Sequence, residues 1–307
     1  MKEKRPTAYR EDRILRRVNR SESDMPLMEF VASELPDAKR TDIKKWLKHG
    51  QIAINGNVTT LFDAPVAPGA EVAVNFTRAF PTFHHPRIEI VYEDDDVIVI
   101  NKGYGLLSVG TASKKKEENA FDILKDYVKD VNPQNRLYVV HRLDRDTSGL
   151  MMFAKTEEAQ ETLRHNWNNL ILERLYVAVL EGYLEEDKGY MKTRLMENSR
   201  YVVYSTANPD EGKIAVTHWE VMARGNGYTL AHFSLDTGRK NQIRVHASDM
   251  GHPIAGDRKY GAQTSPIHRL ALHAQTLRFA HPRTRKDMHF QTPVPEAFEK
   301  ALRRRRK

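Results

Sequence analysis

The sequence contains no cysteine and no long apolar run. Without thiols the chain forms no disulfides, has no thiol nucleophile and offers no thiolate ligands for zinc. The longest apolar runs have about five or six residues, such as 176–180, whereas a membrane-spanning helix needs about twenty. The first residues are rich in arginine and no apolar stretch follows them. We therefore expect no secretory signal, no membrane association and a cytoplasmic protein.

Motifs for metals and for nucleotide phosphates are also missing. The histidines form no HExxH pattern, and His84 and His85 stand in a proline-rich segment without the spacing of metal ligands. The glycines of residues 103–110 do not have the spacing of a phosphate-binding loop. The acidic run 94–96 could hold a cation, but a charged hairpin turn is the simpler explanation. The sequence therefore predicts no metal site.

Positive charge is concentrated at the two ends of the chain. The net charge is +8; residues 1–20 contribute +5, and the sequence RRRRK at 303–307 contributes another +5. The rest of the chain is close to neutral. Basic ends on a near-neutral body indicate a polyanionic partner such as a nucleic acid, although charged termini can equally serve only to solvate a chain.

Local patterns predict an α+β protein with two domains. Apolar residues at helical spacing predict helices near 27–35 and 41–48, and at 118–130 and 157–170. Thr41 is expected to cap the second of these and Gly50 to end it. Strands at 52–54, 71–76, 88–92, 97–102 and 175–180, with a meander that turns at 225–227, predict a largely antiparallel sheet. The expected boundaries are a mobile basic arm 1–22, a small α+β domain 23–77, a linker 78–87, a larger domain 88–295 and a basic tail 296–307.

The first domain carries a basic helix followed by a hairpin. The stretch KRTDIKKWLKHGQIAINGNV, with PGAEVAV after it, resembles the S4 RNA-binding domain. Charge alone would suit an ordinary solvated helix, but the hairpin after the helix favours RNA binding. Cationic side chains contact phosphates without reading base sequence. The candidate RNA contacts are Lys39, Arg40, Lys44, Lys45 and Lys48.

The segment HRLDRDTSGLMMFAKT at 141–156 brings a carboxylate between cations. Asp144 stands between Arg142 and Arg145, and nearby cations favour the ionised form of an acid. A turn at 147–149 then leads into a buried strand. From these residues alone, a structural salt bridge at the end of a strand is the simpler explanation.

Four stretches in the same order change that interpretation. HRLDRDTSGL is nearly identical to the central motif of the RluA-type pseudouridine synthases. The chain resembles that family over about residues 88–282. The other stretches are IVYEDDDVIVINKGYGL, RLYVAVLEG, and DTGRKNQIRVHASDMGHPIAGDRKYG followed by RLALHAQTLRFAHP. The chain departs from the family pattern at Gly103 and Tyr104, where proline and alanine are common, and at Arg174, where lysine is usual.

The resemblance implies a pseudouridine synthase fold and an enzyme that isomerises uridine in RNA without a cofactor. The bond from the base nitrogen to ribose breaks, the uracil rotates, and it rejoins through carbon. By resemblance Asp144 is the catalytic aspartate and Arg244 pairs with it. Arg142 would fill the place of the flipped base, Tyr176 would pack on the uracil, and Ile243 would line its pocket. Extruding a nucleotide costs a few kcal/mol, which a cation and an aromatic platform offset.

The substrate and two other function classes stay open at this point. Family members with such an N-terminal domain often act on large-subunit ribosomal RNA, so we expect that substrate, with transfer RNA as the alternative, and a monomer. A non-catalytic RNA-binding factor is a second class. A hydrolase with two carboxylates is a third, because Asp144 and Asp146 on an extended chain would face one way about 6–7 Å apart. Arg145 between them and the turn at Thr147 argue against it.

Overall fold

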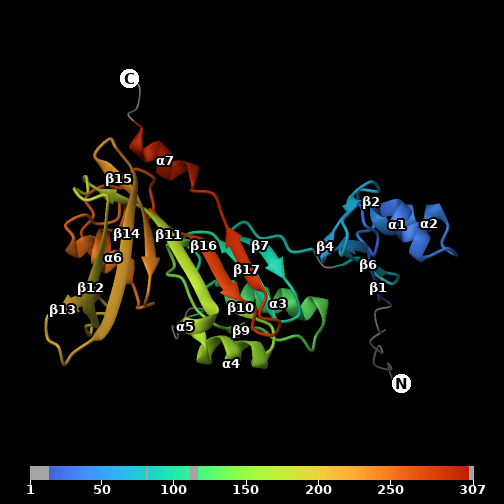
Figure 1. Cartoon of the computed structure of the whole chain (residues 1–307), viewed down its shortest axis with the longest axis horizontal. Helices are drawn as coiled ribbons and strands as arrows, with labels where there is room; N and C mark the ends of the chain where they lie inside the picture. The colour runs from blue at the N-terminus through green and yellow to red at the C-terminus, as the bar shows by residue number, and fades with distance from the viewer. Residues whose placement is uncertain (1–13, 81, 111–116, 304–307) are drawn as a thin grey trace, which may run out of the picture. The chain divides into compact units, whose positions relative to one another are not determined.

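The structure, a computed structural model, describes residues 14–80, 82–110 and 117–303. The chain divides into two compact units, residues 1–83 and 84–307, and this division falls inside the segment 78–87. Within the described ranges no helix is long and apolar enough to cross a membrane. Figure 1 shows both units and labels most of their helices and strands.

The first unit packs two short helices on a small antiparallel sheet. The helices are α1 (Leu27–Glu34) and α2 (Arg40–Lys48). The sheet has the order β1 (Ile14–Val18), β6 (Glu71–Asn75), β3 (Ile52–Ile54) and β4 (Asn57–Val58), and β2 (Met25–Pro26) pairs separately with β5 (Pro65–Val66). Ile43 and Leu47 share one face of α2 and are buried with Leu27, Phe30 and Ile52 in the core of the unit. The charged face of α2 is thereby left exposed.

Local turn chemistry in this unit is as predicted, with one exception. Asn55 and Gly56 both have positive φ, at 49° and 81°, and they join β3 to β4. Gly50 follows α2 with a φ of 64°. The predicted cap at Thr41 is wrong, because the helix begins one residue earlier at Arg40 and Lys39 occupies the cap position.

Part of the predicted basic arm is ordered structure. Residues 14–18 form β1, which pairs with β6 from Ile14 opposite Asn75 to Val18 opposite Glu71. Arg16 is also paired with Glu71 across these strands (2.6 Å). The arm prediction is therefore wrong for these residues, since a partner strand more than fifty residues away orders them. Residues 1–13 lie outside the described ranges.

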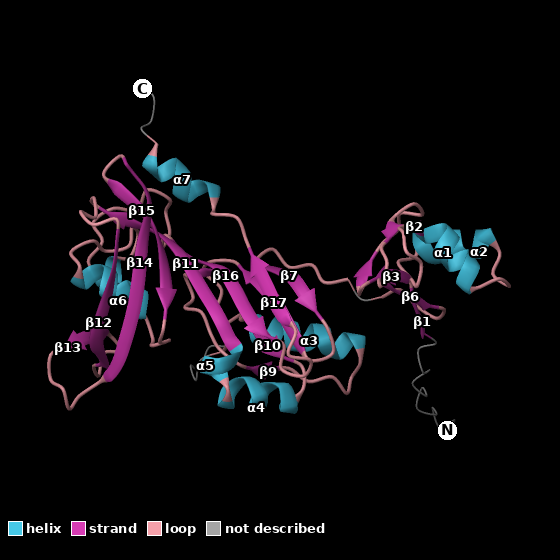
Figure 2. Ribbon diagram, in the orientation of Figure 1, coloured by secondary structure: helices cyan, strands magenta, loops and turns pink. Residues whose placement is uncertain are grey.

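The second unit is built on one large mixed sheet, which Figure 2 shows in magenta. Its strand order is β13-β12-β14-β15-β11-β16-β10-β8-β7, with β17 beside β16 and β9 beside β10. The pairings of the described strands are antiparallel except β10 with β16. The strands are β7 (Ile88–Glu93), β8 (Val97–Lys102), β9 (Tyr138–Val139), β10 (Ser148–Ala154), β11 (Ile171–Glu181), β12 (Lys188–Glu197), β13 (Val203–Thr206), β14 (Lys213–Gly225), β15 (Tyr228–Leu235), β16 (Leu272–Ala280) and β17 (Asp287–Gln291).

Helices cover both halves of this sheet. Towards β7–β11 lie α3 (Ala120–Val131), α4 (Glu157–His165) and α5 (Trp167–Leu170); towards β12–β15 lie α6 (Gln242–Asp249) and α7 (Glu296–Leu302) (Figure 1). Thr156 caps α4 by accepting a hydrogen bond from Ala159 N–H (3.1 Å). The predicted helix 157–170 is interrupted at Asn166. The α+β prediction is confirmed.

The predicted basic tail is also partly wrong. Residues 296–302 form α7, whose Phe298 is fully buried in the same core cluster as Val177 and Phe233. The spacing of Phe298 and Ala301 gives this short helix one apolar face, which packs on the sheet instead of extending into solvent.

Gly149 is required where the central motif enters the sheet. Its φ is 114°, and it pairs with Ala274 of the parallel neighbour β16. A Cβ on Gly149 would lie 2.1 Å from the carbonyl oxygen of Ala274. The sequence TSG therefore allows the two backbones to approach closely directly after the loop that carries Asp144.

Candidate active site

Asp144 lies in the loop between β9 and β10. The loop turns at this residue, where Thr147 N–H donates a hydrogen bond to the Asp144 carbonyl (3.2 Å). The Asp144 side chain is 25% exposed. It is therefore shielded on most sides and still accessible from one.

Buried hydrogen bonds fix the backbone on both sides of Asp144. The Ser108 hydroxyl donates to the Leu143 carbonyl (2.7 Å) and accepts from Leu143 N–H (3.1 Å). On the other side, Lys102 Nζ donates to the Arg145 carbonyl (3.1 Å). Since both neighbours of Asp144 are held, the loop presents the carboxylate in one position.

Lys102 is an unusual buried cation beside this loop. It is 0% exposed, and its Nζ also donates to the carbonyls of Gly103 (2.9 Å) and Leu106 (2.9 Å). Burial lowers the pKa of Lys102 to about 8, and the charges of Asp146 and Asp144 partly oppose that shift. At neutral pH the group is therefore an ammonium ion with three carbonyl acceptors.

Arg244, in the first turn of α6, joins Asp144 to a second carboxylate. Its Nη1 donates to Asp144 Oδ2 (3.1 Å), while its Nε and Nη2 form a fork onto the two oxygens of Asp257 (2.6 and 2.7 Å). The Asp257 side chain is 1% exposed. Burial alone would lower the pKa of Arg244, but the two carboxylates raise it, so the guanidinium stays charged.

Asn241 gives Asp144 its second hydrogen bond. This residue has a left-handed backbone (φ 53°) directly before α6. Tyr260 Oη donates to Asn241 Oδ1 (3.0 Å), and this assigns the amide nitrogen of Asn241 to Asp144 Oδ2, to which it donates. The Tyr260 ring also lies under the Arg244 guanidinium, 4.9 Å from ring centre to Cζ. Tyr260 thus supports both residues that hold Asp144.

The two oxygens of the Asp144 carboxylate are not equivalent. Both side-chain hydrogen bonds go to Oδ2. From the residues that the structure describes, Oδ1 receives no hydrogen bond. The arrangement therefore anchors one oxygen and leaves the other to act on a bound molecule.

Tyr176 on β11 and Ile243 in α6 meet at the same core cluster between the sheet and the helix. Tyr176 on β11 is opposite Phe233 on β15, and both contact the core cluster that contains Ile243 and Ala247. Burial raises the pKa of the Tyr176 phenol; Arg174 opposes the shift, and the charge of Asp144 adds to it. Tyr176 is thus a neutral phenol within the electrostatic reach of Asp144. Ile243 is largely buried in the core behind it.

The sequence neighbours of Asp144 do not hold its charge. Arg145 forms an ion pair with Glu117, and Arg142 is exposed and has no ion pair within the described ranges. Within the described ranges neither arginine forms an ion pair with Asp144, so its neighbours in the chain do not supply that contact. Arg244, one hundred residues away, is the cation that contacts Asp144, as the family resemblance implied.

Sequence reasoning did not single out four residues of this site. Lys102, Asn241, Asp257 and Tyr260 all stood within stretches that carried the family resemblance. Asp257 and Tyr260 lie in GDRKYG and Asn241 in RKNQIR. Only the fold reveals that these polar groups are buried together, because burial of a polar side chain leaves no periodic signal in the sequence.

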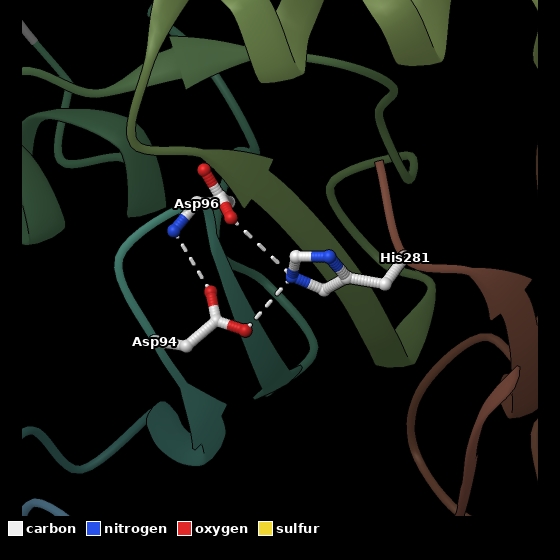
Figure 3. Close-up of side chains that lie close together, drawn as sticks. All are labelled: Asp94, Asp96 and His281. Atoms are coloured by element: carbon white, nitrogen blue, oxygen red, sulfur yellow. Dashed lines mark hydrogen bonds and ion pairs between the residues drawn. The ribbon is translucent and has the colours of Figure 1, made fainter. Parts of the chain in front are cut away.

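Asp94, Asp96 and His281 also gather closely, at the turn between β7 and β8 (Figure 3). His281 Nδ1 accepts from the backbone N–H groups of Arg283 (3.3 Å) and Thr284 (3.1 Å), so its Nε2 carries the proton and donates to Asp94 (3.0 Å). Arg283 Nε donates to Asp96 (2.7 Å). A metal would need the lone pair at the His281 nitrogen that holds the proton. The hydrogen bonds therefore indicate a structural contact between this turn and the end of β16.

The five cations predicted to contact RNA all lie at α2. Lys39 caps the helix, and Arg40, Lys44, Lys45 and Lys48 are exposed along it. Ile43 and Leu47 are buried on the opposite side. The structure thus gathers these cations on the solvent side of one helix.

Comparison with known proteins decides the family. The sequence model of the RNA pseudouridylate synthase family matches residues 96–249. The chain belongs to this family. The match contains β8, the Asp144 loop, Tyr176 and the whole of α6, whereas Asp257 and Tyr260 lie beyond its end.

Individual synthases support the same assignment. The RNA pseudouridine synthase YlyB of Bacillus subtilis is 36% identical over 285 residues, which cover 91% of this chain and 93% of the relative. Ribosomal large subunit pseudouridine synthase D of Pasteurella multocida is 33% identical over 289 residues, with 89% and 88% covered. The human RNA pseudouridylate synthase domain containing 4 shares the fold, with a TM-score of 0.57 at 22% identity over 69% of this chain and 91% of its own.

Membership of a pseudouridine synthase family confirms the predicted isomerase class and RNA as the substrate class. The hydrolase with two carboxylates and the non-catalytic RNA-binding factor are thereby excluded as descriptions of the second unit. The family match begins at residue 96, so the S4 resemblance of the first unit stays a prediction.

Proposed function

We propose that the protein converts specific uridines of large-subunit ribosomal RNA to pseudouridine, with Asp144 as the catalytic carboxylate. The observation that carries the assignment is the asymmetry of that carboxylate. Arg244 and Asn241 hydrogen bond to one oxygen, and the other oxygen has no partner within the described ranges. A group that is fixed and still available is what acid–base or nucleophilic catalysis needs.

The reaction is a rearrangement within one nucleoside. The bond from the base nitrogen to ribose breaks, the uracil rotates, and a new bond forms from ribose to a ring carbon, so no atoms or electrons are gained or lost. Asp144 Oδ1 would either attack the nucleoside or remove a ribose proton. On both routes Arg244 keeps the carboxylate in place, and Asp257 keeps Arg244 in place.

Three further residues have roles in holding the extruded nucleotide. Tyr176 would pack on the uracil ring and Ile243 would line its pocket, and both are held by the same core cluster. Arg142, exposed at the start of the same loop as Asp144, would enter the stack where the base had been. Together these contacts offset the cost of extrusion, which amounts to a few kcal/mol.

The first unit would bind RNA as an S4-like domain. Lys39, Arg40, Lys44, Lys45 and Lys48 provide five cations against the single acid Asp42 of α2. Such a surface binds phosphates without sequence preference and adds affinity for a large RNA. Ribosomal RNA as the target is supported by the Pasteurella multocida relative, a ribosomal large subunit pseudouridine synthase. We further propose that the protein acts as a monomer in the cytoplasm.

The proposal is tested with large-subunit ribosomal RNA from cells that lack the protein. Purified protein should form pseudouridine at a small number of uridines, detected by chemical marking and primer extension. Asp144→Asn should reduce the rate at least about 10²-fold and leave RNA affinity unchanged. Asp146→Asn is the matched control, because it removes an exposed carboxylate from the same loop, and it should retain activity.

Two results would contradict the proposal. Modification by Asp144→Asn at the wild-type rate would remove Asp144 from the mechanism. Modification of transfer RNA, with ribosomal RNA left unchanged, would leave the enzyme class intact and refute the proposed target.

A further inference from the structure

Two large apolar side chains are exposed side by side in the first unit. Leu61 is 62% exposed and Phe62 is 60% exposed, in the loop between β4 and β5. Side chains of this type are usually buried, and the core of this unit is formed without them. Together the two side chains form an apolar surface that is open to a partner outside the domain.

The backbone of this loop is fixed although its side chains are exposed. Thr59 N–H donates to the Ile52 carbonyl (3.1 Å), and Leu61 N–H donates to the Thr59 hydroxyl (3.2 Å). The Phe62 carbonyl accepts from Met28 N–H (2.8 Å), one of the free donors at the start of α1. The ring of Phe62 is thus presented from an anchored position, which reduces the entropy lost when a partner binds.

Phe62 forms one wall of a hollow of about 560 Å³ against α2. The remaining lining residues are Lys44, Leu47, Lys48 and Thr60. Leu47 is almost fully buried and gives the hollow an apolar base. Within the described ranges neither lysine forms an ion pair and both are exposed, so both ammonium groups are available to an anionic ligand.

We propose that this hollow binds one unpaired base of the RNA substrate, with the base stacked on Phe62 and its flanking phosphates on Lys44 and Lys48. The inference rests on the proposed RNA-binding function of the first unit and adds a base-binding subsite to it. Charge complementarity selects the occupant, because a nucleotide combines a flat apolar face with an anionic backbone. An aromatic platform beside cations is the usual arrangement for single-stranded nucleic acid.

A stacked base contributes about a five- to 150-fold gain in affinity. We expect Phe62→Ala in the full chain to weaken binding of a uridine decamer within that range. Phe62→Trp, which keeps an aromatic face, should restore binding. Leu61→Ala is the matched control, because Leu61 is equally exposed and does not line the hollow.

The salt dependence separates stacking from charge. Phe62→Ala should leave the slope of log affinity against log salt unchanged, whereas Lys44→Ala and Lys48→Ala should each reduce it by about 0.7. In a parallel experiment, a decamer with 5-iodouridine is photo-cross-linked to the protein, and the cross-link should map to Phe62 by mass spectrometry.

Three results would overturn the inference. The first is that Phe62→Ala and Leu61→Ala bind the decamer with equal affinity. The second is a cross-link confined to residues 84–307, and the third is a smaller salt slope for Phe62→Ala than for wild type. If the two variants bound the decamer equally, the hollow would have to bind a protein partner instead of RNA. Because these experiments measure binding only, they are independent of pseudouridine formation by Asp144, and failure of one proposal is distinguishable from failure of the other.

Discussion

Replacing Lys102 by methionine should change how the stability of the second unit depends on pH. The Lys102 ammonium is 0% exposed, and burial lowers its pKa from 10.5 to about 8. Unfolding returns the side chain to water and restores its ordinary pKa. Between these two values the unfolded state binds more protons than the folded state, so the free energy of unfolding rises with pH.

The size of the effect follows from the two pKa values. One pKa unit corresponds to about 1.36 kcal/mol. Titrating one group with pKa values of about 8 (folded) and 10.5 (unfolded) from pH 7 to pH 9.5 adds about 2 kcal/mol to the free energy of unfolding. Methionine has no proton to lose, and every other titratable group is common to both proteins. The wild-type protein should therefore gain about 2 kcal/mol relative to Lys102→Met over this range.

Urea unfolding at the two pH values measures this difference. In a Trp46→Phe background, fluorescence reports only on Trp167 and Trp219 of the second unit. A difference between wild type and Lys102→Met that stays constant with pH would refute the reasoning. A loss of stability of wild type relative to Lys102→Met as the pH rises would also refute it, because the three carbonyl hydrogen bonds would then outweigh the cost of burying the charge.

Two further substitutions test the support of the site. Asn241→Ala removes a hydrogen bond to the Asp144 carboxylate, and such a bond is worth about 1.5–3 kcal/mol. We therefore expect kcat/KM to fall about 10- to 150-fold while RNA affinity stays unchanged. Unchanged kinetics would contradict this expectation. Gly149→Ala should destabilise the protein by about 3 kcal/mol or more in urea unfolding, because the new Cβ overlaps the backbone of Ala274. Gly105→Ala has positive φ but open space around it, so an equal loss there would show that the overlap is unimportant.

Features that depend on a few neighbouring residues could be predicted from the sequence. The turn at Asn55-Gly56 has the positive φ angles that this pair favours, and Gly227 turns the β14–β15 hairpin in the same way. The predicted helix start at residue 157 is likewise fixed locally, because the Thr156 hydroxyl accepts a hydrogen bond from Ala159 N–H, three residues away. In each case the interacting atoms are close in the chain, so the tertiary structure only has to preserve what the local chemistry already favours.

Features that depend on distant segments could not be predicted in this way. The strand at 14–18 exists because β6 pairs with it, and its mostly exposed side chains do not alternate between buried and exposed positions. The surroundings of Asp144 show the same limit. Chain proximity pointed to Arg142 and Arg145, whereas the contact comes from Arg244 at the start of α6. Arg244 could be predicted only from the family resemblance, because the family's motifs include residues that are distant in the chain and in contact in the fold.

The departure at Gly103 shows what the loop after β8 contributes to the site. Proline is common here in the family, and proline has no N–H. In this chain Gly103 N–H donates to the Arg87 carbonyl (2.7 Å), and a Cβ at this position would lie only 3.1 Å from Arg87 Cα. The Gly103 carbonyl, which either residue type possesses, accepts from Lys102. Lys102 is therefore held by a backbone carbonyl that is present with either glycine or proline at position 103. Lys102 in turn holds the Arg145 carbonyl beside Asp144, so this support of the site does not depend on the residue type at 103.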